Sequence, residues 1–391
     1  MRICSHLRCL GILLGLSLLP SINAVYGSEI IRVALEQQAT RVDIVSTGLF
    51  QIQLSSRKSV TQRGPFTIRP DGDLLEIAGH QVRVKDVHIR GKSPTMKVSL
   101  TPGSTGEWVI GGNIHITHQG SRLQVVNRLD VEEYVTGVVA SEISSSWHQE
   151  ALKAQAVAAR TYVLYKKMLN SGEDFDVVAS VQDQVYTGHQ QVTKSIKEAI
   201  DQTRGEVITF ERRPIFAAYS STAAGPTEDA NNVWSLDVPY LKGVDCPFDA
   251  KSPKYTWQAS VPFDTVERQL QKEGYPVGTL ATLTPYTFTQ AGRVNEIRIL
   301  HSKGELIVRG QDFRRVVGYR TIPSTQFHVE SIGRDVVLAG KGAGHAVGLC
   351  QWGTKEMAEL GYRYTSILQY YYPGTKLRQV DDIILVPPPA S

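Results

Sequence analysis

The segment that most limits the fold is WHQEALKAQAVAARTYVLYKKML, residues 147–169. As a helix, it places alanine or larger apolar side chains nearly all round its axis, which is typical of a helix buried on every side. Ser146, with Gln149 three residues later, predicts where this helix begins. A chain of 391 residues is long enough to supply the surrounding core. The sequence therefore predicts a large core built around a buried helix.

A shorter helix precedes it and carries an acid on its apolar face. Asp130 and Glu133 resemble a capping box at its start, and we expect the helix to end near Ile143. Its apolar stripe consists of Val131, Val135 and Val138. Glu142 stands at the next position of that stripe, close to Trp147. Because burial disfavours the charged form, a raised pKa would make Glu142 a candidate proton donor.

Arg160 is a charge inside the predicted buried helix. A guanidinium stays protonated, so within a core it needs a carboxylate or several acceptors. We take Glu142 as its candidate partner, which would favour the ionised carboxylate and oppose a raised pKa. Two alternatives stay open: a purely structural ion pair, or a Glu142 that turns outward at the helix end.

The first quarter of the chain alternates short apolar and polar stretches. From about residue 28 to 122, segments such as QVRVKDVHIR and RLQVVNRL are punctuated by Gly, Pro and Asp, as strands and turns are. We expect a larger mixed domain over 123–380, with a subdomain inserted at 255–335 and a Pro-rich tail over 381–391. The predicted fold class is α+β, with a β-rich N-terminal unit followed by a larger mixed α/β domain.

The amino terminus carries basic residues, then the apolar run LGILLGLSLLP, then small residues at Ala24 and Gly27. This order is typical of a cleavable secretory signal over residues 1–27, and no other stretch is apolar enough to span a membrane. We therefore expect an exported protein of the periplasm, cell envelope or extracellular space. The formal net charge of +4 is small and scattered, which argues against a nucleic-acid partner.

Several common catalytic and metal-binding motifs are missing. The Gly-rich loop GKGAGHAVGLCQWG lacks the Walker spacing, and H-E-x-x-H, C-x-x-C and G-x-S-x-G do not occur. His345 in that loop could carry a proton, donate a hydrogen bond to a substrate or serve a structural role. Outside the predicted signal only Cys246 and Cys350 remain, and these could pair or stay as buried thiols. We expect no cofactor and no metal site.

Three segments, in this order, resemble the signature of the stage II sporulation protein D (SpoIID) / LytB family. They are RLDVEEYVTGVVASEISSSWHQEALKAQAVAARTYVLYK, STAAGPTEDANNVWSLDVPYLKGVDCP and GHAVGLCQWGTKEMAELGYRYTSILQYYYPGTKL. The resemblance runs from about residue 121 to 377. It implies an exported protein that acts on peptidoglycan, either as a lytic transglycosylase or as an amidase enhancer.

The resemblance also implies roles for individual residues. By position, the family's catalytic acid falls on Glu142, its active-site arginine on Arg160, and its Tyr-x-Lys on Tyr240 and Lys242. His345 and Gln351, in the last matched segment, complete the set of candidate substrate-binding or supporting residues.

One part of the sequence departs from the family pattern. Some members have a zinc-binding loop with His and Cys near the position of YSSTAAG and further Cys near CPFD. Here Ser220 and Ala223 stand at the first positions, and Asp249 follows a lone Cys246. We therefore predict that this loop holds no metal.

The leading hypothesis from the sequence is a non-hydrolytic cut of glycan strands that an amidase has stripped of peptides, leaving 1,6-anhydro ends. A two-carboxylate glycosidase needs a second acid, whereas attack by a hydroxyl of the substrate does not, which agrees with a single conspicuous acid. Two alternatives have no catalytic step: a glycan-binding enhancer of a cell-wall amidase, and a structural component of an envelope or engulfment complex. The expected partners are therefore peptidoglycan glycan strands and, in the first alternative, an amidase.

Overall fold

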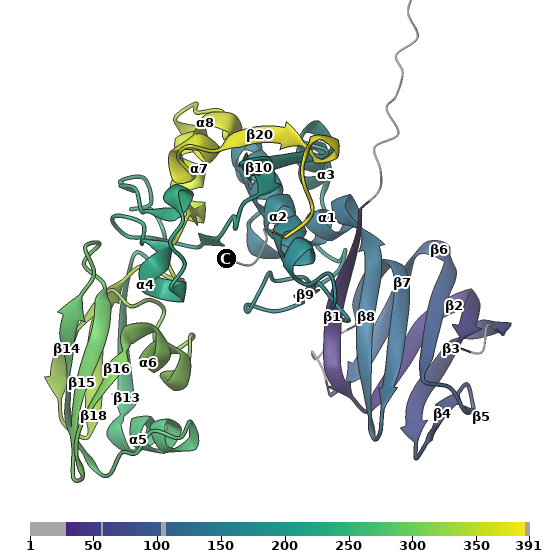
Figure 1. Ribbon diagram of the computed structural model, residues 1–391, viewed down its shortest axis with the longest axis horizontal. Helices are drawn as coiled ribbons and strands as arrows, with labels where there is room; N and C mark the ends of the chain where they lie inside the picture. The colour runs from purple at the N-terminus through teal and green to yellow at the C-terminus, as the bar shows by residue number, and fades with distance from the viewer. Residues whose placement is uncertain (1–28, 56–57, 103–106, 388–391) are drawn as a thin grey trace, which may run out of the picture.

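The computed structural model describes residues 29–55, 58–102 and 107–387, so the predicted signal at 1–27 lies outside the described residues. The predicted α+β class is confirmed, because a β-rich N-terminal part leads into a mixed domain of helices and small sheets. Figure 1 shows three parts in a row: the N-terminal sheet, a central helical part, and a sheet-containing subdomain at the opposite end. Within the described ranges, no helix has the length and apolarity needed to cross a membrane.

The N-terminal part is a nine-stranded sheet in the order β5-β4-β3-β2-β6-β7-β8-β1-β9. Neighbouring strands are antiparallel except β1 and β9, which are parallel. The strands are β1 (Ile30–Ala39), β2 (Arg41–Leu54), β3 (Ser59–Asp71), β4 (Leu74–Ile77), β5 (His80–Val82), β6 (Asp86–Thr101), β7 (Trp108–Gln119), β8 (Arg122–Asp130) and β9 (Val177–Val178). Buried residues alternate with more exposed ones along β6 and β7, as period-two patterning requires.

The last strand of this sheet leads directly into the two helices predicted from the sequence. Asp130 caps α1 (Val131–Glu142) by accepting a hydrogen bond from the Glu132 N–H at 2.8 Å. The second helix, α2 (Gln149–Leu169), is capped by His148. The predicted start at Ser146 is wrong, because the Ser146 hydroxyl hydrogen-bonds with Ser144 instead of capping the helix.

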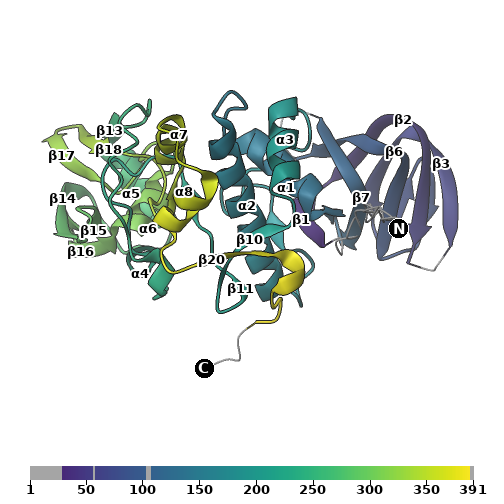
Figure 2. The same cartoon turned by 90° about the horizontal axis from the view of Figure 1, so that it is seen from above.

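The prediction that α2 is buried is confirmed. It contacts α1, α3 (Lys194–Gln202), α7 (Gln351–Glu359) and α8 (Tyr364–Tyr371), and it also lies against β10 (Glu206–Phe210). Figure 2 shows α3 and α1 on one side of α2 and α7 and α8 on the other. Strand β10 pairs with β11 (Arg213–Pro214) and β20 (Lys376–Gln379). One continuous hydrophobic core joins these elements to the N-terminal sheet.

The subdomain at the far end has a hydrophobic core of its own. It contains two three-stranded sheets, in the orders β13-β18-β17 and β14-β15-β16. Its elements are β13 (Thr256–Pro262), α5 (Phe263–Lys272), β14 (Leu280–Phe288), β15 (Val294–His301), β16 (Gly304–Arg309), α6 (Gly310–Val317), β17 (Phe327–Ile332) and β18 (Asp335–Lys341).

Short elements connect the subdomain to the helical part. Strand β12 (Tyr219–Ser220) pairs in parallel with β19 (Leu349–Cys350), immediately before α7. Between β12 and the subdomain lie α4 (Ala230–Trp234) and the 3-10 helix η1 (Pro239–Leu241), and η2 (Val380–Asp382) follows β20. The pairing of β12 with β19 brings two regions of the chain that are far apart in sequence to the end of α1.

Candidate active site

Glu142 is the last residue of α1 and is half-buried where β12, α2 and α7 meet. Its Oε1 accepts a hydrogen bond from the Val185 N–H at 2.9 Å. Its Oε2 accepts a longer hydrogen bond, 3.4 Å, from Gln351 Nε2. The Tyr219 hydroxyl also hydrogen-bonds to this carboxyl group. The groups hydrogen-bonded to Glu142 are therefore an amide, a backbone N–H and a phenol, and none of them is a second carboxylate.

Tyr219 is held in place by a chain of buried hydrogen bonds. Gln184 Nε2 donates to the Tyr219 hydroxyl oxygen at 3.0 Å, and the Tyr134 hydroxyl donates to Gln184 Oε1 at 3.1 Å. Because the Tyr219 oxygen accepts from Gln184, its own O–H is left to donate towards Glu142. The chain thus orients the phenol on the carboxyl group.

Gln351 connects Glu142 to the buried helix. Besides Glu142, its Nε2 contacts Gln155 Oε1 at 3.4 Å, and both glutamines are almost fully buried. In the described part of the chain, Gln155 Nε2 is buried without a hydrogen-bond partner. Because buried polar atoms are normally paired, this donor is a place where a water or a ligand oxygen could be bound.

Burial raises the pKa of Glu142 above its ordinary value. The hydrogen bonds from Val185, Gln351 and Tyr219 favour the ionised form and oppose that shift in part. The same carboxyl group can therefore hold a proton at a higher pH than an exposed glutamate, and its neighbours can stabilise the carboxylate that remains after the proton leaves.

Arg160 does not pair with Glu142, so that prediction is wrong. Its guanidinium forms a bidentate ion pair with Glu132, with Nε–Oε1 at 2.9 Å and Nη2–Oε2 at 2.6 Å, and Nη1 donates to the Glu206 carbonyl at 3.0 Å. The short connection over residues 143–148 makes α1 and α2 an antiparallel pair. Arg160, well inside α2, therefore faces the first turn of α1, about 15 Å from its end at Glu142.

Tyr240 and Lys242 also stand apart from Glu142. Tyr240 is buried with its ring 5.5 Å from that of Phe210, its oxygen accepts the Phe216 N–H, and burial raises its pKa to about 12. Lys242 is exposed and pairs with Asp229 and Asp237. Within the described ranges, neither shares a hydrogen bond or an ion pair with Glu142. No direct contact with Glu142 therefore supports their predicted role.

His345 lies beside Tyr219 but is not suited to carry protons. Its Nδ1 accepts the Val347 N–H at 3.0 Å, and its ring also hydrogen-bonds to the backbone of Tyr219. Burial and the neighbouring Arg314 lower its pKa to about 3, so the imidazole is neutral near neutral pH. The structure favours the structural alternative among the three open for this residue, because the ring braces the strand that carries Tyr219.

Two tryptophans flank the residues of the site: Trp147 follows Glu142 by five positions, and Trp352 directly follows Gln351. Trp147, in the connection after α1, packs edge to face against Trp352, which follows Gln351, with ring centroids 5.4 Å apart. Both are only partly buried. Partly exposed indole faces beside an acid can stack on sugar rings.

Cys246, Asp249 and Cys350 are buried together at the start of α7, with their ligand atoms within 4.8 Å of one another. Both cysteines are free thiols. Asp249 Oδ2 already accepts from the Ala224 N–H at 2.7 Å and from the Cys350 thiol at 3.2 Å. A structural zinc site needs four ligands. Ala223 has no donor atom and the Ser220 hydroxyl accepts the Ala346 N–H, so these residues do not fit the zinc loop of the family resemblance.

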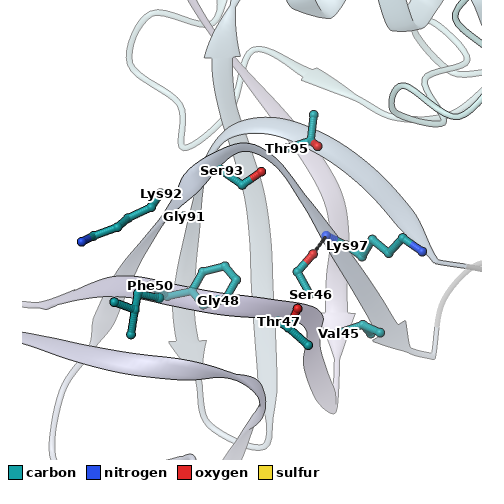
Figure 3. Close-up of a pocket in the computed structure, with 11 residues that line it drawn as sticks. Val45, Ser46, Thr47, Gly48, Phe50, Gly91, Lys92, Ser93, Thr95 and Lys97 are labelled. Carbon is teal, nitrogen blue, oxygen red and sulfur yellow. Dashed lines mark hydrogen bonds between the residues drawn. The ribbon is translucent and has the colours of Figure 1, made fainter.

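A surface pocket of about 390 Å³ opens elsewhere, between β2 and β6 of the N-terminal sheet (Figure 3). It lies where the pairing of these strands is interrupted between Ile44 and Phe50, and Ser46 Oγ there accepts the Lys97 N–H at 2.7 Å. None of the six site residues predicted from the sequence lines it. The pocket therefore does not belong to the site around Glu142.

Of the candidate supporting residues named from the sequence, Gln351 contacts Glu142, and three other residues around the site were not among the candidates. Gln155 had a signal, because it is a polar interruption in an otherwise apolar helix and is 1% exposed. Tyr219 stands two positions before the second matched segment, and no periodicity marks it. Val185 contributes only its backbone N–H, which no side-chain pattern can report.

Comparisons with known proteins cover most of this chain. A sequence profile described as "Stage II sporulation protein" matches residues 119–210, and one described as a domain of unknown function matches residues 226–348. The chain is 33% identical to stage II sporulation protein D of Bacillus subtilis (strain 168) over 306 residues, or 74% of this chain and 87% of that protein. The protein of that name from Bacillus amyloliquefaciens is 32% identical over 335 residues, or 82% and 91%.

A further relative has a different name. The amidase enhancer of Bacillus subtilis (strain 168) is 31% identical over 286 residues. The match covers 62% of this chain but only 40% of that protein. Glu142 and Arg160 both fall within the region matched by the first profile, residues 119–210.

Proposed function

The chain belongs to the stage II sporulation protein D family, as its motifs led us to expect, and on that premise we propose that it is an exported lytic transglycosylase. Its substrate is the glycan strand of peptidoglycan already stripped of stem peptides, and the bond cut joins N-acetylmuramic acid to N-acetylglucosamine. The observation that carries the proposal is a half-buried acid with a raised pKa whose hydrogen-bonding neighbours are all neutral.

The proposed reaction uses Glu142 first as an acid and then as a base. Protonated Glu142 donates its proton to the glycosidic oxygen, the bond from that oxygen to C1 of the muramyl residue breaks, and an oxocarbenium-like centre forms. The muramyl 6-hydroxyl oxygen then bonds to C1 and returns its proton to Glu142. The products are a 1,6-anhydro end and a free hydroxyl on the leaving sugar.

The surroundings of Glu142 support each step of this cycle. Between the two proton transfers the carboxylate is negative, and the Val185 N–H, Gln351 and Tyr219 stabilise it there. Internal attack by the substrate makes a second carboxylate unnecessary. Trp147 and Trp352 offer stacking faces for neighbouring sugars.

The pH dependence follows from the direction of the pKa shift. The donor must be protonated, so cleavage should be fastest on the acid side and fall as the pH rises through the raised pKa of Glu142. Tyr219→Phe removes a hydrogen bond that favours the ionised form, so the pKa of Glu142 should rise further. The decline of the cleavage rate with pH should then occur at higher pH. Rates of glycan cleavage measured across the pH range check this.

Tyr162→Phe is the matched control for Tyr219→Phe. Its hydroxyl donates to Asp183 at 2.9 Å and does not contact Glu142, although its ring lies 6.5 Å from that of Tyr219. We expect its pH profile to match that of the parent. If the cleavage rate of Tyr219→Phe declined at the same pH as that of the parent, this would contradict the assignment of Glu142 as the titrating acid.

The amidase-enhancer relative favours one alternative: the same site around Glu142 binds glycan and stimulates a separate amidase without cutting. Mass spectrometry of amidase-treated peptidoglycan incubated with the purified protein separates the two functions. The transglycosylase releases fragments with 1,6-anhydro ends when acting alone. The enhancer releases none alone but accelerates an amidase added to intact peptidoglycan.

A further inference from the structure

Asp86, His88 and His115 lie together on one side of the N-terminal sheet. Asp86 and His88 are two residues apart on β6 and so point to the same side. His115 stands directly opposite His88 on β7. The two imidazole rings stack with centroids 4.1 Å apart and planes within 3°. The alternate residues of both strands, such as Ile89 and Ile114, are in the core, which fixes the side on which the three polar residues lie.

The candidate ligand atoms of these three residues lie close together. Nε2 of His88 lies 3.6 Å and Nε2 of His115 lies 3.8 Å from the same oxygen of Asp86, Oδ1. All three atoms are within 4.8 Å of one another. A tetrahedral ion with bonds of 2.0 to 2.1 Å places its ligand atoms about 3.3 to 3.5 Å apart. A contraction of a few tenths of an ångström would bring the carboxylate to that spacing, and at least one of the two parallel imidazole rings would also have to turn so that both nitrogen lone pairs point at the ion.

His115 carries a second sign of a missing ligand. Its Nε2 is buried and has no hydrogen-bond partner in the described part of the chain, although buried polar atoms are normally paired. Two further charges lie near the ring: the positive Arg128 on β8 and the negative Asp174 in the loop after α2. The unpaired Nε2, rather than the charges around the ring, is the observation that indicates a missing ligand.

We propose that Asp86, His88 and His115 bind one divalent transition-metal ion, with zinc the best match. Two imidazoles and a carboxylate are ligands that zinc and its first-row neighbours accept, whereas calcium and magnesium prefer oxygen ligands alone. All three side chains are partly exposed, which leaves the remaining coordination position to water. The ion would join β6 to β7, outside the hydrogen-bond network of Glu142.

This inference departs from the sequence-based expectation of no metal. The expectation rested on linear motifs, and these ligands come from two strands, with His88 and His115 27 positions apart. Only the register of β6 against β7 brings them together. A one-residue slip of either strand would turn its ligands to the core side.

The test is metal binding by the purified full chain after removal of bound metal with a chelator. Titration with Zn²⁺ in a calorimeter should show saturable binding, and the metal should raise the thermal unfolding temperature. His88→Gln and His115→Gln should each weaken that binding at least about tenfold. His118→Gln is the matched control. His118 lies on β7, as His115 does, but it donates to the Gly120 carbonyl and is not part of the cluster.

The outcome that overturns the proposal is equally specific. His88 is the more exposed of the two histidines, with a side chain 40% exposed against 24% for His115, so His88→Gln tests the site even if His115→Gln misfolds. Absence of saturable binding, or unchanged affinity in His88→Gln, overturns it.

A titration with Co²⁺ distinguishes binding at this site from binding at the buried cysteines. A thiolate-to-cobalt absorption band that persists in the histidine variants, with no other bound ion, assigns binding to Cys246 and Cys350 and also overturns it.

Discussion

Replacing Glu142 with glutamine should abolish the release of 1,6-anhydro fragments while the protein still folds and binds peptide-stripped glycan. The amide has the shape of the acid and can still accept the Val185 N–H, but it has no proton to give to the glycosidic oxygen. Loss of general acid catalysis should lower the rate by about 10²- to 10⁴-fold. Mass spectrometry of the released products measures the rate, and co-sedimentation with denuded glycan measures binding.

Glu359→Gln provides the matched control for that change. Glu359 is the last residue of α7, is exposed and pairs with Lys355, so its substitution should leave product release at the parent level. Equal product yield from the Glu142→Gln protein and the parent would refute Glu142 as the acid. No product from the parent itself, with faster release by an added amidase, would favour the enhancer function instead.

Replacing Arg160 with methionine should destabilise the protein by about 3–5 kcal/mol, because it leaves Glu132 buried without its cation. Glu132 Oε1 would keep only the Gly205 N–H, at 3.0 Å, of the buried contacts that now hold its carboxylate. Denaturation in urea, followed by tryptophan fluorescence, should show the lower unfolding midpoint. The double variant Arg160→Met/Glu132→Leu should lose less, because no unpaired charge remains in the core.

The control for this prediction is an ion pair at the surface. Arg315 pairs with Glu273 with both side chains well exposed, so Arg315→Met should change stability by less than about 1 kcal/mol. The result also decides between two roles for Arg160. An Arg160→Met protein with the parent's unfolding midpoint but a shifted pH profile of cleavage would mean that the arginine acts on Glu142 and not on Glu132.

Patterns within single elements were the part of this protein that could be predicted. The burial of α2 and the end of α1 near Glu142 follow from helical periodicity, which repeats every few residues and needs no knowledge of the partner element. The predicted start of α2 was wrong because Ser146 and His148 can both cap a helix. Which of them does so depends on where the connecting chain turns.

Contacts between elements could not be predicted in the same way. Periodicity marked Arg160 as a buried charge that needs a partner, but the nearest conspicuous acid on α1 was the wrong one. The partner is Glu132 because antiparallel packing sets the middle of α2 against the start of α1. Likewise, Tyr240 resembles a family site residue by position, yet it is held by the ring of Phe210 and the backbone N–H of Phe216.

By itself the sequence determined the α+β class, the buried central helix, the family and the single acid that stands out on an apolar stripe. Only the tertiary structure decided what surrounds that acid, since Val185 and Gln351 lie 43 and 209 positions away along the chain. It also decided which histidines and acids share a surface of the N-terminal sheet. The physical reason is that local patterns record which face of an element is buried, whereas its neighbours depend on the strand register and helix packing of the whole fold.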